Sequence, residues 1–207
     1  MLTLPKVYAI TDTTISGLSH AEQVRQLIDG GIGLIQLREK RLAPGDWIED
    51  AISAAKIARE NNVILIVNDR VDIAVTIDAD GVHLGQTDMP AEAARRLLGP
   101  KKIIGVSTHT VEQARNALSQ PIDYIAFGPI FPTSTKADPD EVTGVERLSA
   151  IRNIVGDMPL VAIGGIDHSN GADVIAAGAD SVAVISCLLN GERSISKSSH
   201  DLTAITA

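Results

Sequence analysis

The sequence predicts an α/β protein in which residues 1–207 form one (β/α)₈ TIM-barrel domain. Eight short runs rich in β-branched residues recur along the chain, and segments with the apolar spacing of helices lie between most of them. Apolar residues make up 44% of the chain and aromatic residues only 2%, so Val, Ile, Leu and Ala must build the core. Parallel strands covered by helices have this composition. An open doubly wound sheet is less favoured, because no Gly-x-Gly-x-x-Gly motif follows the first run.

The expected elements alternate in order along the chain. The strands are residues 7–10, 33–37, 63–67, 81–84, 103–106, 124–127, 160–163 and 181–185. The helices are residues 21–29, 47–61 (with a start signal at 44–46), 71–77, 91–98, 111–118, 145–155 and 171–177.

Glycine residues mark the ends of helices, and aspartate residues mark the starts of strands. Gly30, Gly31 and Gly178 supply the positive φ that ends a helix. An aspartate stands just before three of the strands, at positions 80, 123 and 180. The Ser-rich tail from about residue 192 predicts a poor last helix or partial disorder.

Composition excludes several classes of function. The net charge is −8 and no stretch is rich in Lys and Arg, so nucleic acid is not an expected partner. The single cysteine, Cys187, excludes an internal disulfide and suits a small buried side chain in a reducing cytoplasm. No signal peptide and no membrane-spanning run is evident, so we expect a cytoplasmic protein without a membrane partner. The number of subunits stays open, a homo-oligomer being one option.

The row of residues 36–40 is the most informative segment. Because side chains alternate along a strand, Gln36, Arg38 and Lys40 share one face and Leu37 lies on the other. Two cations and an amide at the end of an apolar strand are costly unless they are compensated. A phosphate or diphosphate would compensate them, and so would ion pairs with Glu39 or with nearby helix carboxylates.

Polar residues also follow the other strands. In barrels of this class the chemistry lies at the C-terminal ends of the strands. The residues expected there are Asn68, Asp69, Arg70, Gly85, Gln86, Thr87, Asp88, Ser107, Thr108, His109, Gly128, Thr133, Ser134, Thr135, Lys136, Gly164, Gly165 and Ser186. Polar groups at so many strand ends indicate one binding site for a polar, anionic ligand.

Two of these residues are candidate metal ligands. Asp69 and Asp88 stand on neighbouring loops, and Mg²⁺ binds one or two carboxylates together with substrate phosphate oxygens. Each aspartate also precedes a helix, where it could act as an N-cap. The basic residues beside them favour the metal.

A glycine pair and a long loop provide further candidates. Gly164–Gly165 lets backbone N–H groups approach a phosphate, with Ser186 completing the site. A plain tight turn and a helix start are the simpler readings. Lys136, within the long connection 128–144, is either a solvated lysine or a cation that reaches the ligand when the loop closes. His83, within a strand, is expected to pack in the core, whereas His109 is either a proton carrier or structural.

Taken together, the chain resembles the thiamine-phosphate synthase (thiamine phosphate pyrophosphorylase) family over nearly its whole length. The matching segments are residues 8–12, 36–40, 68–70, 81–86, 105–107, 128–133, 136, 163–166 and 185–186. The resemblance implies a transferase that joins 4-amino-5-hydroxymethyl-2-methylpyrimidine diphosphate to hydroxyethylthiazole phosphate. The products would be thiamine phosphate and diphosphate. The cofactor would be Mg²⁺, and the partners would be the two phosphorylated small-molecule substrates.

The resemblance also implies roles for individual residues. Gln36 contacts the pyrimidine, and the whole row, Leu37 and Glu39 included, binds substrate. Diphosphate binds to Arg38, Lys40, Asn68, Ser107 and Lys136, of which Arg38, Ser107 and Lys136 are catalytic. Mg²⁺ binds to Asp69 and Asp88. The thiazole phosphate binds to Thr133, Ser134, Thr135, Gly165, Ile185 and Ser186.

Two rival functions remain at this point. A thiazole tautomerase on the same scaffold would use His109 as proton carrier, but it would not need the 36–40 row together with Asp69 and Asp88. A non-catalytic phosphate-ligand binder would bind ligand and release no diphosphate.

Overall fold

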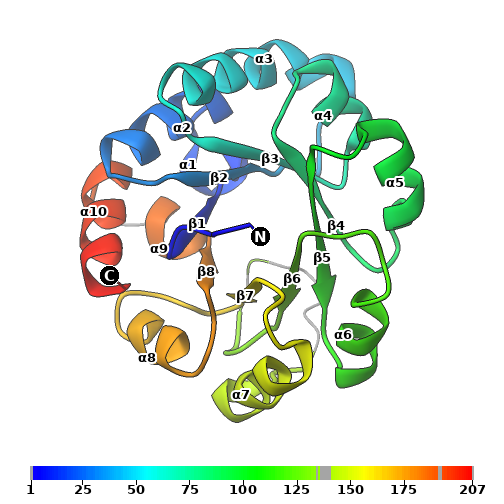
Figure 1. Cartoon of the computed structure of the whole chain (residues 1–207). Coiled ribbons are helices and arrows are strands. Elements are labelled where there is room, and N and C mark those ends of the chain that lie inside the picture. The colour runs from blue at the N-terminus through cyan, green and yellow to red at the C-terminus, as the bar shows by residue number, and fades with distance from the viewer. Residues whose placement is uncertain (1, 134, 136–140, 191–192, 207) are drawn as a thin grey trace.

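The computed structural model is a closed barrel of eight parallel strands surrounded by helices (Figure 1). It describes residues 2–133, 135, 141–190 and 193–206. The strands follow one another around the ring in chain order, and the first pairs with the last. The predicted fold class is therefore confirmed.

The strands lie close to where the sequence places them. Four have the expected bounds, and the others differ by one or two residues at an end. They are Val7–Ile10 (β1), Leu34–Leu37 (β2), Ile64–Asn68 (β3), Gly81–Leu84 (β4), Ile103–Thr108 (β5), Tyr124–Phe127 (β6), Leu160–Ile163 (β7) and Ser181–Val184 (β8).

All seven expected helices are present. They are His20–Asp29 (α2), Pro44–Glu60 (α3), Val71–Thr76 (α4), Ala91–Leu98 (α5), Val111–Ala117 (α6), Gly144–Val155 (α7) and Gly171–Ala176 (α8). The single-turn helix Thr13–Ser16 (α1) was not expected, whereas the single-turn helix Ser186–Leu189 (α9) begins at Ser186, where a helix start was one of the two readings. The side chain of Asp12 caps α1 by accepting from the N–H groups of Thr14 and Ile15. No helix in the described ranges is long and apolar enough to span a bilayer.

Alternation along the strands produces two apolar layers. One fills the space between the strands and the helices and contains Ile35, Leu37 and Val67. The other fills the barrel interior and contains Tyr8, Leu34, Ile66, Tyr124, Ala126, Val161 and Ala183. Nearer the C-terminal strand ends the interior-facing residues of β2 to β5 are polar, whereas those of β1, β6 and β7 (Ile10, Ala126 and Ile163) are apolar. One side of the interior thus changes from apolar to polar toward that end.

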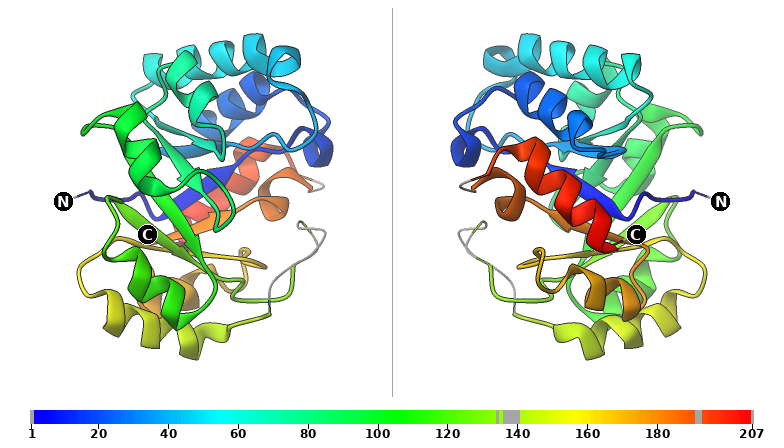
Figure 2. Two further views of the ribbon diagram at one scale, coloured as in Figure 1. Left: turned by 90° about the vertical axis from the view of Figure 1, so that its right-hand side faces the viewer. Right: turned by 90° about the vertical axis from the view of Figure 1, so that its left-hand side faces the viewer.

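The last helix contradicts the expectation of a weakly structured tail. Residues Ile195–Thr206 form α10, which packs against α2 and α8 on the outside of the barrel (Figure 2, right). Leu202 is fully buried there. The tail serines are small, and Ser199 comes so close to Gly30 that a Cβ on Gly30 would lie 2.5 Å from the Cβ of Ser199. Small side chains thus allow close helix packing, which composition alone did not reveal.

Gly30 therefore has a different role from the one expected. Its φ is −85°, whereas Gly31 and Gly178 have φ of 86° and 111°. Gly31 and Gly178 therefore confirm the prediction of a positive φ at these helix ends. Gly30 is required instead for the close approach of α10.

The aspartates before three strands join neighbouring strands at the N-terminal end of the barrel. Each carboxylate accepts from a backbone N–H at or near the start of the preceding strand at 2.8 Å, and the three donors are Leu65, Ile104 and Leu160. The backbone N–H groups of the aspartates bond to the carbonyls of the same three residues. This repeated two-point pairing sets the register of adjacent strands.

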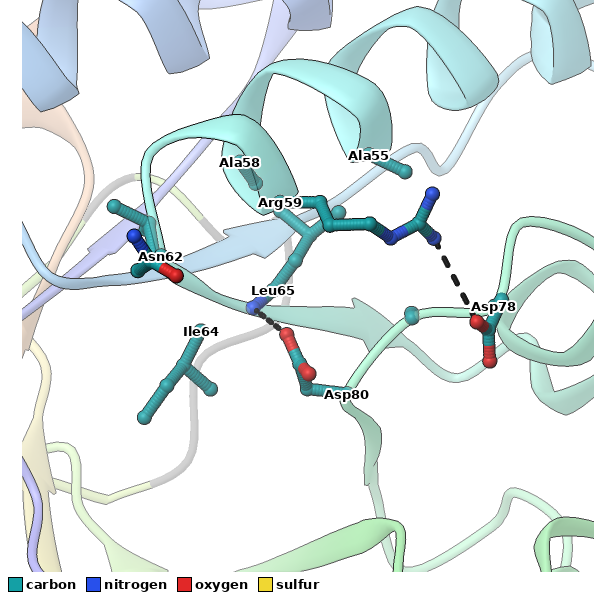
Figure 3. Close-up of a pocket in the computed structure, with 10 residues that line it drawn as sticks. Ala55, Ala58, Arg59, Asn62, Ile64, Leu65, Asp78 and Asp80 are labelled. Carbon is teal, nitrogen blue, oxygen red and sulfur yellow. Dashed lines mark hydrogen bonds and ion pairs between the residues drawn. The ribbon is translucent and has the colours of Figure 1, made fainter.

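A cavity of about 280 Å³ lies beside one of these junctions (Figure 3). Its polar groups bond to each other and to the backbone: Asp80 to the Leu65 N–H, and Arg59 to the Ile77 carbonyl at 3.4 Å and to Asp78 at 3.7 Å. Because these charges are already compensated, the cavity is part of the structural junction between α3, β3 and β4.

Candidate active site

A larger cavity, of about 500 Å³, opens at the C-terminal ends of the strands. This is a typical volume for a small-molecule site, and all eight strands contribute to its lining. The predicted site residues that line it are Gln36, Arg38, Lys40, Asn68, Asp69, Asp88, Ser107, Thr133, Thr135, Gly165, Ile185 and Ser186. Ser134 and Lys136 lie outside the described residues.

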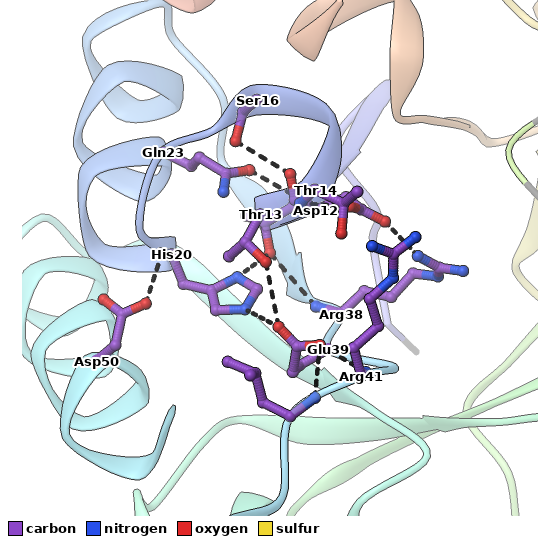
Figure 4. Close-up of polar contacts among 12 residues, drawn as sticks. Asp12, Thr13, Thr14, Ser16, His20, Gln23, Arg38, Glu39, Arg41 and Asp50 are labelled. Carbon is purple, nitrogen blue, oxygen red and sulfur yellow. Dashed lines mark hydrogen bonds and ion pairs between the residues drawn. The ribbon is translucent and has the colours of Figure 1, made fainter. Parts of the chain in front are cut away.

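Leu37 and Glu39 do not line the cavity. Leu37 is fully buried between the barrel and the helices. The carboxylate of Glu39 accepts from the Thr13 hydroxyl and from the backbone N–H groups of Arg41 and Leu42 at 2.7 and 3.2 Å (Figure 4). These bonds lower the pKa of Glu39, although burial opposes them. Glu39 thus shapes the loop that carries its two cationic neighbours.

The cations of the row pair with carboxylates from other strand ends. Arg38 is bonded to Asp12 (Figure 4), and Lys40 to Asp69. Ion pairs with Glu39 or with nearby helix carboxylates were one of the two alternatives, and the two cations do form ion pairs, with Asp12 at the start of α1 and with Asp69 but not with Glu39. Since Asp12 also caps α1, the Arg38 guanidinium is fixed at the cavity by a carboxylate that is itself held in place.

Asp69 and Asp88 face each other across the Lys40 side of the cavity. The Asp69 backbone has φ of 61° and its N–H donates to the His83 carbonyl at 2.8 Å. Asp88 accepts from the Gly85 N–H at 2.7 Å. Burial raises the pKa of Asp69, and Asp88 raises it further, while Lys40 lowers it.

Neither aspartate caps a helix. The helices α4 and α5 begin without a side-chain cap. The two carboxylates instead lie together while only one of them, Asp69, pairs with a lysine. A divalent ion would compensate the remaining negative charge, so this oxygen donor set fits Mg²⁺. No group of three or more metal-binding side chains occurs in the described ranges. Any magnesium here would therefore take its remaining ligands from substrate oxygens and water.

Asn68 presents an unused hydrogen-bond donor. Its Nδ2 is buried and has no hydrogen-bond partner within the described part of the chain, yet the residue lines the cavity. Buried donors are nearly always satisfied in folded proteins. A donor placed beside Lys40 and Arg38 is suited to an anionic ligand.

The glycine pair brings two loops together. Gly164 and Gly165 have φ of 101° and 62°. A Cβ on Gly165 would lie 2.5 Å from the carbonyl oxygen of Pro132, and one on Gly164 would lie 2.5 Å from the Pro129 Cβ. The loop after β7 can therefore pack under the loop after β6 only with glycine at both positions. Ser186, which follows the neighbouring strand β8 and also lines the cavity, begins α9.

A hydrogen-bonded network crosses the barrel interior beneath the cavity. Gln36 Nε2 donates to the Tyr8 hydroxyl at 2.8 Å, and the Tyr8 and Tyr124 hydroxyls lie 3.0 Å apart. His83 bonds through Nδ1 to Tyr124 at 2.9 Å and through Nε2 to Ser107 at 2.8 Å.

Reasoning from the sequence missed this network. His83 was expected to pack in the core. It is indeed buried, but it also lines the cavity and bonds to a site residue. Because side chains alternate along a strand, Tyr8 and Tyr124 point to the barrel interior, as do Gln36, His83 and Ser107. Applying this alternation to the two tyrosines could have revealed the network.

His109 also lines the cavity. Its Nδ1 donates to the Gly128 carbonyl at 2.6 Å, and its backbone N–H donates to Gln113 Oε1 at 2.7 Å. These bonds fix the imidazole between the loops after β5 and β6.

Known proteins resemble the chain over most of its length. A family model described as thiamine monophosphate synthase matches residues 7–188. A thiamine-phosphate synthase of Chloroflexus aurantiacus is 46% identical over 185 residues, covering 89% of this chain and 85% of the relative. The chain belongs to the thiamine monophosphate synthase family.

Further comparisons agree with this membership. A thiamine-phosphate synthase of Methanocella arvoryzae is 44% identical over 200 residues, covering 96% of this chain and 93% of the relative. The solved structure of a thiamine phosphate pyrophosphorylase from Pyrococcus furiosus superimposes with a TM-score of 0.88 at 37% identity, over 98% of this chain and 95% of that one. As a member of the thiamine monophosphate synthase family, the chain is a transferase of thiamine biosynthesis that makes thiamine phosphate.

Proposed function

We propose that the chain joins 4-amino-5-hydroxymethyl-2-methylpyrimidine diphosphate to hydroxyethylthiazole phosphate. The observation that carries this proposal is the meeting of Arg38, Lys40, Asn68, Asp69 and Asp88 at one cavity. Cations, an amide donor that has no partner among the described residues, and a carboxylate pair in one place are the groups that a diphosphate and its counter-ion require.

In the proposed reaction the C–O bond between the pyrimidine methylene and the diphosphate breaks. Diphosphate leaves with the electron pair, and the thiazole nitrogen then forms a bond to the methylene carbon. The amino group of the pyrimidine supplies electrons to the developing carbocation. Because the barrier lies mainly in charge separation, preorganised groups that stabilise the leaving anion lower it.

Different residues of the chain have different roles in this proposed reaction. Arg38, held by Asp12, and Lys40 face the leaving group, together with Asn68 and Ser107. A magnesium ion bound by Asp69 and Asp88 would neutralise part of the diphosphate charge. Thr133, Thr135, Gly165, Ile185 and Ser186 line the other side, where we place the thiazole phosphate. Ser134 and Lys136 are proposed to join these two groups.

The rival functions have less support. The named relatives are synthases, and the 36–40 row meets Asp69 at the cavity, a combination that a tautomerase does not need. A non-catalytic binder would not require charges arranged around a leaving group.

A reconstitution experiment tests the proposal. The purified protein is mixed with both substrates and Mg²⁺, and the release of diphosphate and the formation of thiamine phosphate are measured while each component is omitted in turn. We expect both products only in the complete mixture. Ligand binding without diphosphate release would instead identify a binder.

A matched pair of lysine variants tests the site. Lys40→Ala is expected to lower kcat/KM by about a hundredfold or more, because one preorganised charge is lost. Lys56→Ala removes a lysine that is mostly exposed on α3 and is expected to leave kcat/KM unchanged. Equal activities of the two variants would remove Lys40 from the mechanism.

A further inference from the structure

The network beneath the cavity connects two residues that the proposed function assigns to opposite ends of one substrate. Gln36 stands at the pyrimidine end and Ser107 at the diphosphate end, and three residues link them: Tyr8, Tyr124 and His83. Tyr8 and Tyr124 are 1% exposed, and Gln36 and His83 are 3% and 7% exposed. Since bulk water has little access to the links, their protons must be shared among these residues.

The barrel is shaped to hold the linking residues in place. A Cβ on Gly105 would lie 1.9 Å from the Cζ atom of Tyr124, so only glycine leaves room for this ring. The Tyr124 ring stacks on His83 with centroids 5.5 Å apart and meets Tyr8 edge-on at 6.1 Å. The side chain of Gln86 donates to the Ser107 carbonyl at 2.6 Å and holds the far end.

The number of protons leaves only two consistent arrangements. Each hydroxyl and a neutral imidazole carry one proton, and both ring nitrogens of the buried His83 bond to hydroxyl groups, one of which can donate only if the imidazole is neutral. In the forward arrangement Gln36 donates to Tyr8, Tyr8 to Tyr124, Tyr124 to Nδ1 of His83, and Nε2–H to Ser107. In the reverse arrangement each hydrogen bond runs the other way, and the Gln36 amide is flipped so that its Oε1 accepts from Tyr8. A mixed arrangement places two protons, or none, in a buried link, which is costly.

The ligand at one end decides between the two arrangements. Ser107 lines the cavity, as do Arg38, Lys40 and Asn68, where an anion would bind. A phosphate oxygen can only accept at neutral pH, so the Ser107 hydroxyl donates to it and must accept from His83. That is the forward arrangement, in which the Gln36 Nε2 is used by Tyr8 and the Oε1 remains for the cavity.

We propose that Tyr8, Tyr124 and His83 are positioning residues that form a one-way hydrogen-bond relay, through which the diphosphate end of the substrate fixes Gln36 as an acceptor for a ring amino group. This inference rests on the proposed function. The relay makes the site select an aminopyrimidine over the corresponding oxopyrimidine. The preference for an amino group on the pyrimidine ring then depends on Ser107, which lies at the diphosphate end of the substrate.

Binding measurements with non-reacting ligands test the selectivity. The probes are aminopyrimidine and oxopyrimidine diphosphate analogues in which CH₂ replaces the ester oxygen, together with inorganic diphosphate, each measured by calorimetry with Mg²⁺. We expect the unmodified protein to prefer the amino analogue by about a hundredfold or more, as sites built around a buried hydrogen bond do. No preference would overturn the relay.

Variants separate the relay from simple packing. Tyr124→Phe cuts the relay and is expected to reduce the amino preference by about tenfold, while inorganic diphosphate binds within about twofold of its original affinity. Ser107→Ala is expected to reduce the preference as well, and the double variant to reduce it no further. Tyr8→Phe is the second variant if Tyr124→Phe does not fold. An unchanged preference in a folded variant, or equal losses for all ligands, would show a structural role only.

A spectroscopic measurement is independent of the proposed function. The ¹⁵N NMR signals of His83, assigned with a His83→Gln variant, report which ring nitrogen carries the proton. With inorganic diphosphate present we expect the Nε2–H tautomer. The Nδ1–H tautomer would overturn the relay even if the enzyme turned over its substrates. If the Nε2–H tautomer were found but the aminopyrimidine diphosphate were not a substrate, the proposed function would fail and the relay would remain.

Discussion

Single side chains balance the charge at the rim of the cavity. Lys40 pairs with Asp69, Asp69 faces Asp88, and burial together with this second carboxylate raises the pKa of Asp69. A carboxylate pair with one lysine is a strained arrangement of charge that a divalent cation would relieve. The rim is therefore suited to binding a cation and an anion together.

Removing one charge from the pair tests the metal assignment. We expect Asp88→Asn to raise the Mg²⁺ concentration for half-maximal activity by about tenfold or more, since the remaining carboxylate binds the cation less tightly. Asparagine keeps an oxygen for the Gly85 N–H. Initial rates across a Mg²⁺ titration measure the effect, with the exposed Asp157→Asn as control. An unchanged titration would mean that Asp88 only shapes its own turn.

The sequence predicted these residues because they stand directly after strands. It was less informative where a side chain turns away from the strand direction. Glu39 stands between two cavity residues in the sequence, but its carboxylate bonds to the backbone of the following loop. His83 looked like a core residue because its bonding partner, Ser107, lies on another strand. Contacts between strands depend on register, which alternation within one strand does not specify.

At the scale of elements, junctions between strands and helices hold the barrel together. The three aspartates before β4, β6 and β8 each bond twice to the preceding strand. Two of them also bind an arginine from the helix that comes before that strand in the chain: Arg95 of α5 donates to Asp123 at 2.6 Å, and Arg152 of α7 donates to Asp180 at 3.0 Å. One carboxylate thus joins two strands and a helix.

Truncating such a carboxylate should destabilise the fold. We expect Asp123→Ala to lower the free energy of unfolding by about 1–3 kcal/mol, because the Ile104 N–H and the Arg95 guanidinium lose a partner. Denaturant unfolding measures this loss. Asp157→Ala removes an exposed aspartate and is the control. Equal stabilities of the two variants would show that water replaces the carboxylate at the junction.

The contact between Gly30 and α10 is tested in the same way. Gly30→Ala would place a Cβ 2.5 Å from Ser199 and 2.6 Å from the Ser196 carbonyl, so we expect a loss of about 1–3 kcal/mol in unfolding free energy. Gly45→Ala, whose Cβ would meet nothing within 4 Å, should not destabilise the protein. A stable Gly30→Ala variant would mean that α10 can shift outward without cost.

Predictability from the sequence differs among elements. The strands were predictable because buried parallel strands are short, apolar and rich in β-branched residues. Single-turn helices such as α1 were not, since four residues are too few to show helical spacing. For α10, the Ser-rich composition was misleading because serine also serves as a small residue for close packing.

For the molecule as a whole, buried histidines couple stability to pH. Burial lowers the pKa of His83 to about 4, whereas in the unfolded chain it returns to 6.5. The unfolded state therefore binds more protons between these values. The stabilisation is complete above pH 6.5 and is lost as the pH falls toward 4. His20, fully buried, has a lowered pKa from the same cause and acts in the same direction.

Acid unfolding measures this coupling. We expect the free energy of unfolding to fall between pH 6.5 and 4.5, with His83 contributing up to about 3 kcal/mol by pH 4. A His83→Gln variant should show a shallower slope across this range, whatever its stability at pH 7. Parallel slopes for the two proteins would mean that His83 takes up a proton in the folded state near its ordinary pKa.

The ring is completed by β1 and β8, which lie at opposite ends of the described chain and are joined even by a hydrogen bond that spans 175 positions. During synthesis on the ribosome, β1 cannot pair with β8 until nearly all of this segment has been made. Until then the nascent polypeptide has two unpaired strand edges, which invite association with other chains. The cavity at the strand ends is thus completed late in the synthesis of each molecule, and chaperones have most to protect in the interval before that.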